Sequence, residues 1–225
     1  MVKFKYDIAI IDYFDYKWIE NNKDKYKIID YSSFTSKGIP KGHGIAVTYI
    51  ITRINKNARI VIFSIDKNMS INMLSDILNY IANNKIAKII NLSFGFVSYK
   101  NLKEVMNLKN ACKECFLNNI KIITSNSNNN KKTIPGVFKE IILVDNNYLQ
   151  DKDVKFKKNN VYVKRLQLLV QWVDRKIWVE GNSFYTAIIS SIFSLGIDRD
   201  DEIKFTKIFQ KLDFKYKEIT NDSKF

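Results

Sequence analysis

The amino-acid sequence predicts an α/β fold in which a central, mostly parallel sheet is flanked by helices. Between residues 6 and 145, apolar runs of strand length alternate with segments whose apolar residues recur at helical spacing. The runs are nearly continuous, which is typical of parallel strands covered on both faces. Polar residues follow several runs, among them Asp12, Ser93 and Thr124. Because parallel sheets bind ligands at the carboxyl ends of their strands, we expect the functional site at this edge.

Six apolar runs supply the predicted strands: residues 6–11, 26–29, 58–65, 87–92, 120–123 and 140–145. His43 precedes helical spacing over residues 45–54, and Ser70 is a candidate N-cap for a helix over residues 70–84. Polar composition predicts a loop over residues 17–27, and glycine and proline predict another over residues 32–42.

The spacing of apolar residues over residues 101–118 predicts a third helix. Six of its residues are expected to be buried or half-buried: Leu102, Val105, Met106, Cys112, Phe116 and Leu117. Cys112 and Cys115 are expected to be reduced, partly buried thiols, since a zinc site would need two further ligands and the chain has a single histidine. No metal is therefore predicted.

The pattern changes after residue 146 to short antiparallel strands, including a hairpin that joins residues 154–156 to 161–163. Residues 187–195 are nearly all apolar, so the helix that contains them should be central in the core. A last surface helix is expected over residues 200–212, and residues 215–225 are expected to be a loose tail.

Composition limits the class of protein. With 225 residues and 46% hydrophobic content, one domain over residues 1–225 is expected. The sequence opens with no signal-peptide pattern, and no apolar run reaches the roughly 18 residues of a membrane span, which favours the cytoplasm. The net charge of +14 comes mostly from scattered lysines. This distribution indicates a solvated surface that attracts acidic peptides, whereas nucleic-acid binding would require arginine and aromatic residues clustered on one element.

Ser183 lies at the predicted start of the central helix, directly after Gly181-Asn182. Its hydroxyl has two interpretations. It can cap the helix, or it can act as a nucleophile where the helical N–H groups and the positive end of the helix dipole favour developing negative charge.

The single histidine decides which catalytic arrangement is open to a nucleophilic serine. In α/β-hydrolases the histidine follows the serine, whereas His43 precedes Ser183. The chymotrypsin order requires an all-β fold, which the alternating pattern contradicts. The order aspartate, histidine, serine remains, and it maps onto Asp12, His43 and Ser183.

Five segments in this order resemble the motifs of the subtilisin-like serine peptidases, or subtilases. They are Ile8-Ala9-Ile10-Ile11-Asp12, Gly42-His43-Gly44, Asn91-Leu92-Ser93-Phe94-Gly95, Ser125-Asn126-Ser127-Asn128 and Gly181-Asn182-Ser183. The later segment Ile134-Pro135 resembles the Tyr-Pro of that family. The resemblance spans residues 6 to about 195 and implies a three-layer subtilisin-like sandwich.

The resemblance implies peptide hydrolysis without a cofactor. Ser183 attacks the scissile carbonyl, His43 transfers the proton, Asp12 orients the imidazole, and the Asn128 amide with the Ser183 N–H binds the oxyanion. The peptide substrate is expected to lie against a set of seven residues: Ser93, Phe94, Gly95, Ser125, Asn126, Ser127 and Thr133. Asn126, Asn129 and Asn130 remain alternative oxyanion donors.

Several residues depart from the family pattern. Tyr13-Phe14 follow the aspartate in place of a small residue and glycine, and the serine helix lacks the usual proline. A catalytically silent subtilase-fold module that binds or regulates a partner is therefore the alternative to an active enzyme. For the enzyme, the early catalytic strand leaves no room for a signal or prosegment, so we expect a narrow-specificity intracellular processing peptidase, such as one that removes an acidic leader from a ribosomally made peptide.

Overall fold

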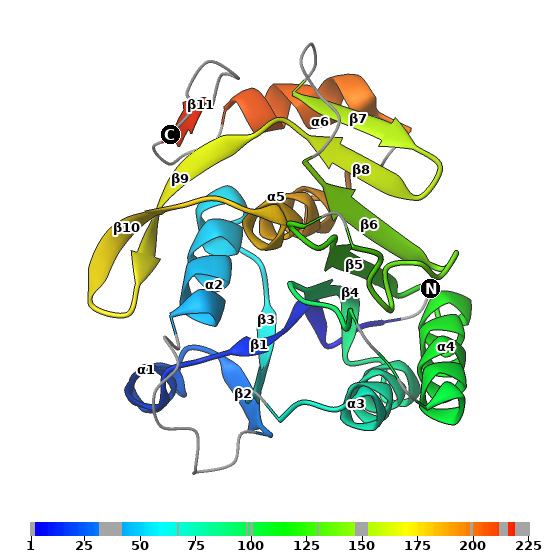
Figure 1. The fold of residues 1–225 in the computed structure, drawn as a ribbon. Helices are drawn as coiled ribbons and strands as arrows, with labels where there is room; N and C mark the ends of the chain where they lie inside the picture. The colour runs from blue at the N-terminus through cyan, green and yellow to red at the C-terminus, as the bar shows by residue number, and fades with distance from the viewer. Residues whose placement is uncertain are drawn as a thin grey trace.

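The computed structural model confirms the predicted fold class (Figure 1). It describes residues 3–31, 42–66, 68–97, 99, 101–129, 131–146, 153–198, 200–211 and 216–218. An eight-stranded sheet has the order β2-β3-β1-β4-β5-β6-β8-β7, and its neighbouring strands are parallel except for β7 and β8. In chain order the strands are β1 (Tyr6–Tyr13), β2 (Lys27–Asp30), β3 (Ile60–Ile65), β4 (Ala87–Leu92), β5 (Lys121–Ser125), β6 (Ile141–Asp145), β7 (Val154–Lys157) and β8 (Asn160–Val163).

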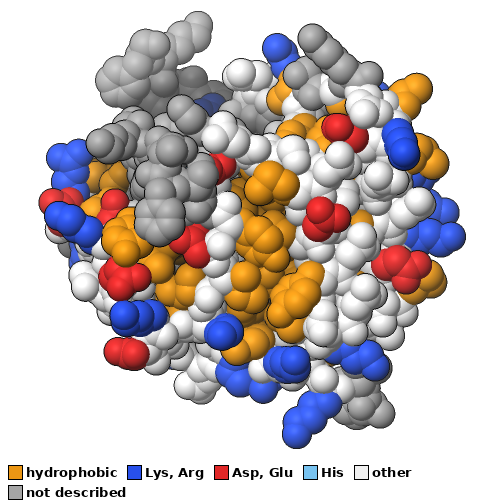
Figure 2. Space-filling model, turned by 90° about the horizontal axis from the view of Figure 1, so that it is seen from below, with side chains coloured by type: hydrophobic (Ala, Val, Ile, Leu, Met, Phe, Trp, Pro, Cys, Tyr) orange, Lys and Arg blue, Asp and Glu red, His pale blue; other side chains and the backbone are white. Residues whose placement is uncertain are grey.

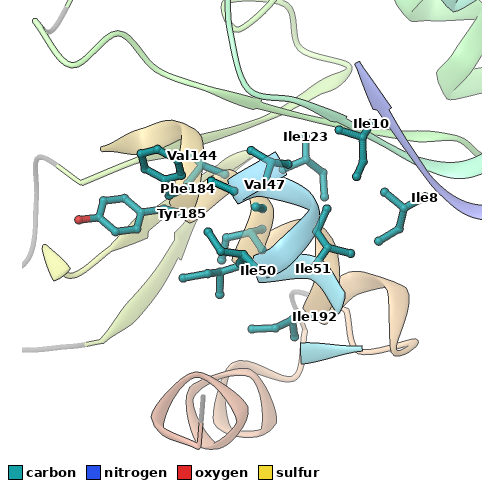
Figure 3. Packing of buried hydrophobic residues seen from close by; sticks show 14 of the residues in the cluster. Ile8, Ile10, Val47, Ile50, Ile51, Ile123, Val144, Phe184, Tyr185 and Ile192 are labelled. Atoms are coloured by element: carbon teal, nitrogen blue, oxygen red, sulfur yellow. The ribbon is translucent and has the colours of Figure 1, made fainter. Parts of the chain in front are cut away.

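Helices cover both faces of the sheet. Helices α2 (His43–Ile54) and α5 (Asn182–Ser194) pack on one face, and α3 (Ile71–Asn83) and α4 (Leu102–Leu117) pack on the other. Strand β1 serves both layers because successive side chains point to opposite faces: Ile8 and Ile10 contact the first layer, and Ala9 and Ile11 the second. Figure 3 shows residues of α2, among them Ile51, packed in the first layer with Ile192 of α5. Helix α5 is thus central, as the sequence predicted.

The antiparallel part divides between two sheets. The hairpin β7–β8 is confirmed, and β8 extends the main sheet by pairing with β6. Strands β9 (Leu166–Trp172), β10 (Arg175–Val179) and β11 (Tyr216–Glu218) form a second sheet in the order β10-β9-β11. The prediction of a loose tail from residue 215 is therefore wrong for residues 216–218, because they pair with β9. Residues 219–225 lie outside the described part of the chain.

Two further helices complete the fold. Helix α6 (Glu202–Gln210) confirms the predicted last helix, and it buries Phe205 and Phe209. Helix α1 (Tyr16–Asn22) corrects the prediction of a loop over residues 17–27. Asp15 caps this helix by accepting hydrogen bonds from the N–H groups of Lys17 and Trp18, and a single residue, Ile19, is buried, so the segment shows little apolar periodicity. The predicted loop over residues 32–42 lies outside the described residues except for Gly42.

The orientation of α4 also differs from the prediction. Its buried residues are Leu108, Ala111, Cys112 and Cys115. Leu102, Met106, Phe116 and Leu117 are exposed instead. The apolar residues of this helix do not form one stripe, so the sequence pattern could not distinguish the covered face from the solvent face. In the part of the chain that the structure describes, no helix is long and apolar enough to span a membrane.

Candidate active site

Asp12 and His43 form a close pair at the carboxyl edge of the main sheet. Asp12 lies near the end of β1 and is 1% exposed, and His43 is the first residue of α2. The Nδ1 atom of His43 lies 2.8 Å from Asp12 Oδ1 and 2.9 Å from Oδ2. The N–H of Tyr13 also donates to Oδ1, at 2.7 Å. The carboxylate therefore has a fixed orientation and holds one ring nitrogen of the histidine, leaving Nε2 for other contacts.

Gly44 allows helix α2 to begin this close to β1. A Cβ atom at this position would lie 2.6 Å from the ring of Phe14 and 2.7 Å from the carbonyl oxygen of Tyr13. Both distances are shorter than a normal contact, and one partner is backbone that cannot move aside easily. The glycine after the histidine thus lets α2 pack directly on the segment that follows Asp12.

The pKa of His43 lies above its usual value of 6.5. Burial of the ring is the largest single influence and lowers the pKa, but the attraction of Asp12 and the hydrogen bond to it together outweigh burial. The ring also packs on Phe184, with ring centroids 5.2 Å apart. Asp12 therefore stabilises the protonated imidazolium, which is the charge that a general base acquires during proton transfer.

Ser183 lies in the first turn of α5, beside this pair, but it does not cap the helix. The N-cap is Gly181, which has no side chain to make a capping hydrogen bond. Gly181 has φ +134°, a backbone conformation that favours glycine. The Ser183 hydroxyl donates instead to the carbonyl oxygen of Ser93, at 2.7 Å. Among the described residues, no hydrogen bond joins Ser183 to His43.

The side chain of Asn128, from the segment after β5, contacts the first residue of α5. Its Oδ1 accepts a hydrogen bond from the N–H of Asn182 at 3.1 Å, and its Nδ2 lies 3.2 Å from where a Cβ on Gly181 would be. The oxygen is held by backbone, and among the described residues the amide hydrogens make no hydrogen bond, so they are available as donors. The amide of Asn128 therefore lies next to the backbone that leads into Ser183.

The alternative oxyanion donors are placed differently. Asn126 donates through Nδ2 to Asp145 at 2.7 Å and accepts from the N–H of Ser127 at 2.9 Å, so its amide is already engaged. Asn129 is exposed, and its N–H donates to Ser127 Oγ at 3.2 Å. Asn130 lies outside the described residues. Of the three asparagines that the structure describes here, Asn128 is the one whose side chain is hydrogen-bonded to the serine helix, whereas Asn126 contacts that helix through its carbonyl oxygen, which accepts from Asn182 Nδ2 at 3.2 Å.

The predicted substrate-lining residues lie along two neighbouring strand ends. Ser93, Phe94 and Gly95 follow β4, whereas Ser125 is the last residue of β5 and Asn126 and Ser127 follow it. Phe96 forms an isolated antiparallel bridge with Ile134. Through this bridge the chain around Thr133 returns to Gly95: a Cβ on Gly95 would lie 2.8 Å from Thr133 Cβ. The structure thus brings the two segments and Thr133 to one edge, next to Ser183.

The face seen from below in Figure 2 bears a band of hydrophobic side chains across its middle, with lysine, arginine and acidic side chains around it. On the coloured part of this face, the basic side chains do not merge into one continuous field.

The two residues after Ser183, Phe184 and Tyr185, are inserted into the core. Figure 3 shows Tyr185 extending away from the α2 side chains, and its hydroxyl both donates to the carbonyl oxygen of Leu166 and accepts from its N–H, each at 2.8 Å. Burial raises the pKa of this phenol to about 12. In the structure Phe184 and Tyr185 bind the serine helix to His43 on one side and to β9 on the other.

The two cysteines of the chain lie on the buried side of α4. Cys112 and Cys115 are buried free thiols on α4, and burial raises the pKa of both, to about 12 for Cys115. Over the described ranges, no group of three or more His, Cys, Asp or Glu side chains could hold a metal ion.

Comparison with known proteins gives a match at the level of structure. The chain matches no family model, and no curated protein sequence matches it. The nisin leader peptidase NisP of Lactococcus lactis superposes with a TM-score of 0.65 at 16% identity, over 93% of this chain and 82% of that one. The epidermin leader peptide processing serine protease EpiP of Staphylococcus aureus gives 0.61 at 13%, over 91% and 68%. A PatG macrocyclase in complex with peptide gives 0.60 at 15%, over 86% and 77%. The chain therefore has the fold of subtilisin-like serine proteases.

Proposed function

We propose that this chain is a serine peptidase whose catalytic residues are Asp12, His43 and Ser183. The observation that carries the proposal is the pairing of a buried carboxylate with the single histidine of the chain, beside a helix start that presents a serine. Packing alone would not require a carboxylate at this place, because burying one is costly and an apolar residue would fill the space without a partner. The fold shared with leader-processing serine proteases supports a peptidase role.

The reaction is acyl transfer. The Ser183 hydroxyl turns from the Ser93 carbonyl toward His43 Nε2, gives its proton to that nitrogen, and its oxygen bonds to the scissile carbonyl carbon. His43 then returns the proton to the leaving amine, and water repeats the sequence to release the acid. These roles follow the mechanism established for subtilisin itself. Asp12 stabilises the imidazolium formed in each half, and Asn128 with the Ser183 N–H stabilises the oxyanion.

The substrate that we propose is a ribosomally made peptide from which an acidic leader is removed within the cell. Two structural neighbours are named as leader peptidases, and a third was solved with peptide. The net charge of +14 would speed association with an acidic leader through long-range attraction. Cleavage of precursor peptides with acidic leaders, but not of unfolded general proteins at a comparable rate, is expected.

A catalytically silent binding or regulatory module is the second candidate, and one observation favours it: the Ser183 hydroxyl is bonded to Ser93 and not to His43. Labelling with a fluorophosphonate separates the two. The peptidase proposal expects a covalent adduct on Ser183 that is absent in Ser183→Ala and forms much more slowly in His43→Ala. Folded wild-type protein that stays unlabelled would establish the silent module instead.

A further inference from the structure

A chain of hydrogen bonds links the interior of α5 to the segment that follows β4. Ser190 Oγ donates to Asn91 Oδ1 at 2.9 Å, and Asn91 Nδ2 donates to Ser93 Oγ at 2.8 Å. Ser93 Oγ in turn donates to the carbonyl oxygen of Ser183 at 3.3 Å, and Ser183 Oγ donates back to the carbonyl oxygen of Ser93 at 2.7 Å. The network therefore ends on the candidate nucleophile, about two helical turns before the residue where it begins.

The network is buried. Asn91 and Ser190 are 0% exposed, and Ser93 is 4% exposed. Their sequence neighbours Ile90, Leu92 and Ile189 are fully buried hydrophobic residues. A polar side chain in such surroundings costs free energy unless it is hydrogen-bonded, and buried hydrogen bonds act in a low dielectric that strengthens them. Apolar residues would fill these places at lower cost, so the position of the network calls for another explanation.

The direction of the hydrogen bonds explains why a polar network lies at this position. Because Asn91 donates to Ser93 Oγ, the hydroxyl hydrogen of Ser93 is left to bond the carbonyl oxygen of Ser183. Ser190 holds the other end of the same amide through its oxygen. The orientation of one asparagine side chain thus fixes the contact between the backbone of the serine and the strand end expected to pair with the substrate.

We propose that Asn91 and Ser190 are positioning residues that hold Ser183 and Ser93 at a fixed separation, so that the nucleophile and the substrate-pairing segment form one rigid unit. This inference rests on the proposed peptidase function. Catalysis by a positioned nucleophile is sensitive to such spacing, since a displacement of about 1 Å can cost about a hundredfold in rate. Neither residue contacts the substrate; both act through Ser93.

The experiment compares Ser190→Ala with Ser191→Ala. Ser191 is the next residue of α5 and is also 0% exposed, but its Oγ donates to the carbonyl oxygen of Ile51 in α2, outside the network. Each variant thus loses one buried hydrogen bond from the same helix. We expect Ser190→Ala to lower the rate of fluorophosphonate labelling about tenfold. It should lower kcat for cleavage of a precursor peptide by a similar factor and leave KM little changed. Ser191→Ala should lower the melting temperature similarly and leave both rates within twofold of wild type.

A double-mutant cycle completes the test. Asn91→Ala should slow labelling by a similar factor, and the double variant Asn91→Ala/Ser190→Ala should be no slower than the slower single variant, because both changes break one network. Rates that fall equally in the Ser190 and Ser191 variants would overturn the positioning role, and so would a labelling rate in Ser190→Ala equal to wild type. Those results leave the peptidase proposal standing, whereas unlabelled wild-type protein would overturn both.

Discussion

The hydroxyl of Ser183 donates to the carbonyl oxygen of Ser93 at 2.7 Å, while the His43 ring is bonded through Nδ1 to Asp12. The proposed nucleophile and the proposed base are thus each held by a hydrogen bond, but to different partners. A carbonyl oxygen at the end of β4 can also accept from the N–H of an extended peptide, which would compete with the Ser183 hydroxyl. We infer that substrate binding at Ser93 favours the turn of Ser183 toward His43.

The raised pKa of His43 should set the pH dependence of the proposed peptidase activity. The base must be neutral, so kcat/KM should rise with pH through a midpoint above 6.5. In Asp12→Asn the burial of the ring persists while the attraction of the carboxylate is lost, so the midpoint should fall below 6.5 and the maximal rate should drop. A pH profile of peptide cleavage measures both effects. A midpoint that stays in place in Asp12→Asn would contradict the pairing.

The same pairing contributes to stability, with a definite sign. A histidine whose pKa is raised on folding stabilises the protein fully below its unfolded value of about 6.5, and the contribution is lost as pH rises through the folded pKa. Urea unfolding between about pH 5.5 and 8.5 should therefore show wild type losing this increment relative to His43→Ala. If the free energies of unfolding of wild type and His43→Ala changed in parallel with pH, the pairing would make no such contribution.

Replacement of Asn128 tests the oxyanion site. Asn128→Ala should lower kcat by about a hundredfold to a thousandfold, the range known for loss of one such donor in a subtilisin, with little change in KM. Asn129→Ala is the matched control, because this neighbouring residue is exposed and, within the described part of the chain, makes no hydrogen bond to the serine helix. Equal losses in the two variants would place the donor elsewhere.

Tyr185 should be structural and not catalytic. Tyr185→Phe leaves the N–H and the carbonyl oxygen of Leu166 without their hydrogen-bond partner in a buried place, which should lower the free energy of unfolding by about 1–3 kcal/mol. The control Tyr80→Phe changes a ring that is 41% exposed and should change stability little. Chemical denaturation gives the two values, and fluorophosphonate labelling of the remaining folded Tyr185→Phe protein should proceed at the wild-type rate.

Thr133 offers a stabilising substitution. Its Oγ1 is buried and has no hydrogen-bond partner within the described ranges. Valine has nearly the same shape without the hydroxyl, so Thr133→Val should raise the free energy of unfolding by about 1–3 kcal/mol. Thr52→Val is the contrasting change, because the Thr52 hydroxyl donates to the carbonyl oxygens of Thr48 and Tyr49. A destabilised Thr133→Val protein would mean that the hydroxyl has a partner in solution.

The amino-acid pattern was sufficient for the parallel sheet and its main helices. Strand β4 agrees with its predicted bounds, and Ser70 caps α3 through the N–H of Met73, as its position before an apolar helix suggested. These features depend on local periodicity and local hydrogen bonds, which a short window of sequence contains. Helix α1 was missed because it buries a single residue, and the solvent face of α4 was predicted incorrectly because apolar residues lie on more than one face of that helix.

For the candidate site, the sequence by itself determined the residue types and their order: one histidine, an aspartate at a strand end, and a serine after Gly181. Only the tertiary structure decided which atoms meet. It joined Asp12 to His43, turned Ser183 toward Ser93 and linked Asn91 to Ser190 across 99 positions of the chain. The physical reason is that hydrogen-bond partners of buried polar groups are chosen by the packing of helix on sheet, and such long-range contacts leave no periodic trace in the sequence.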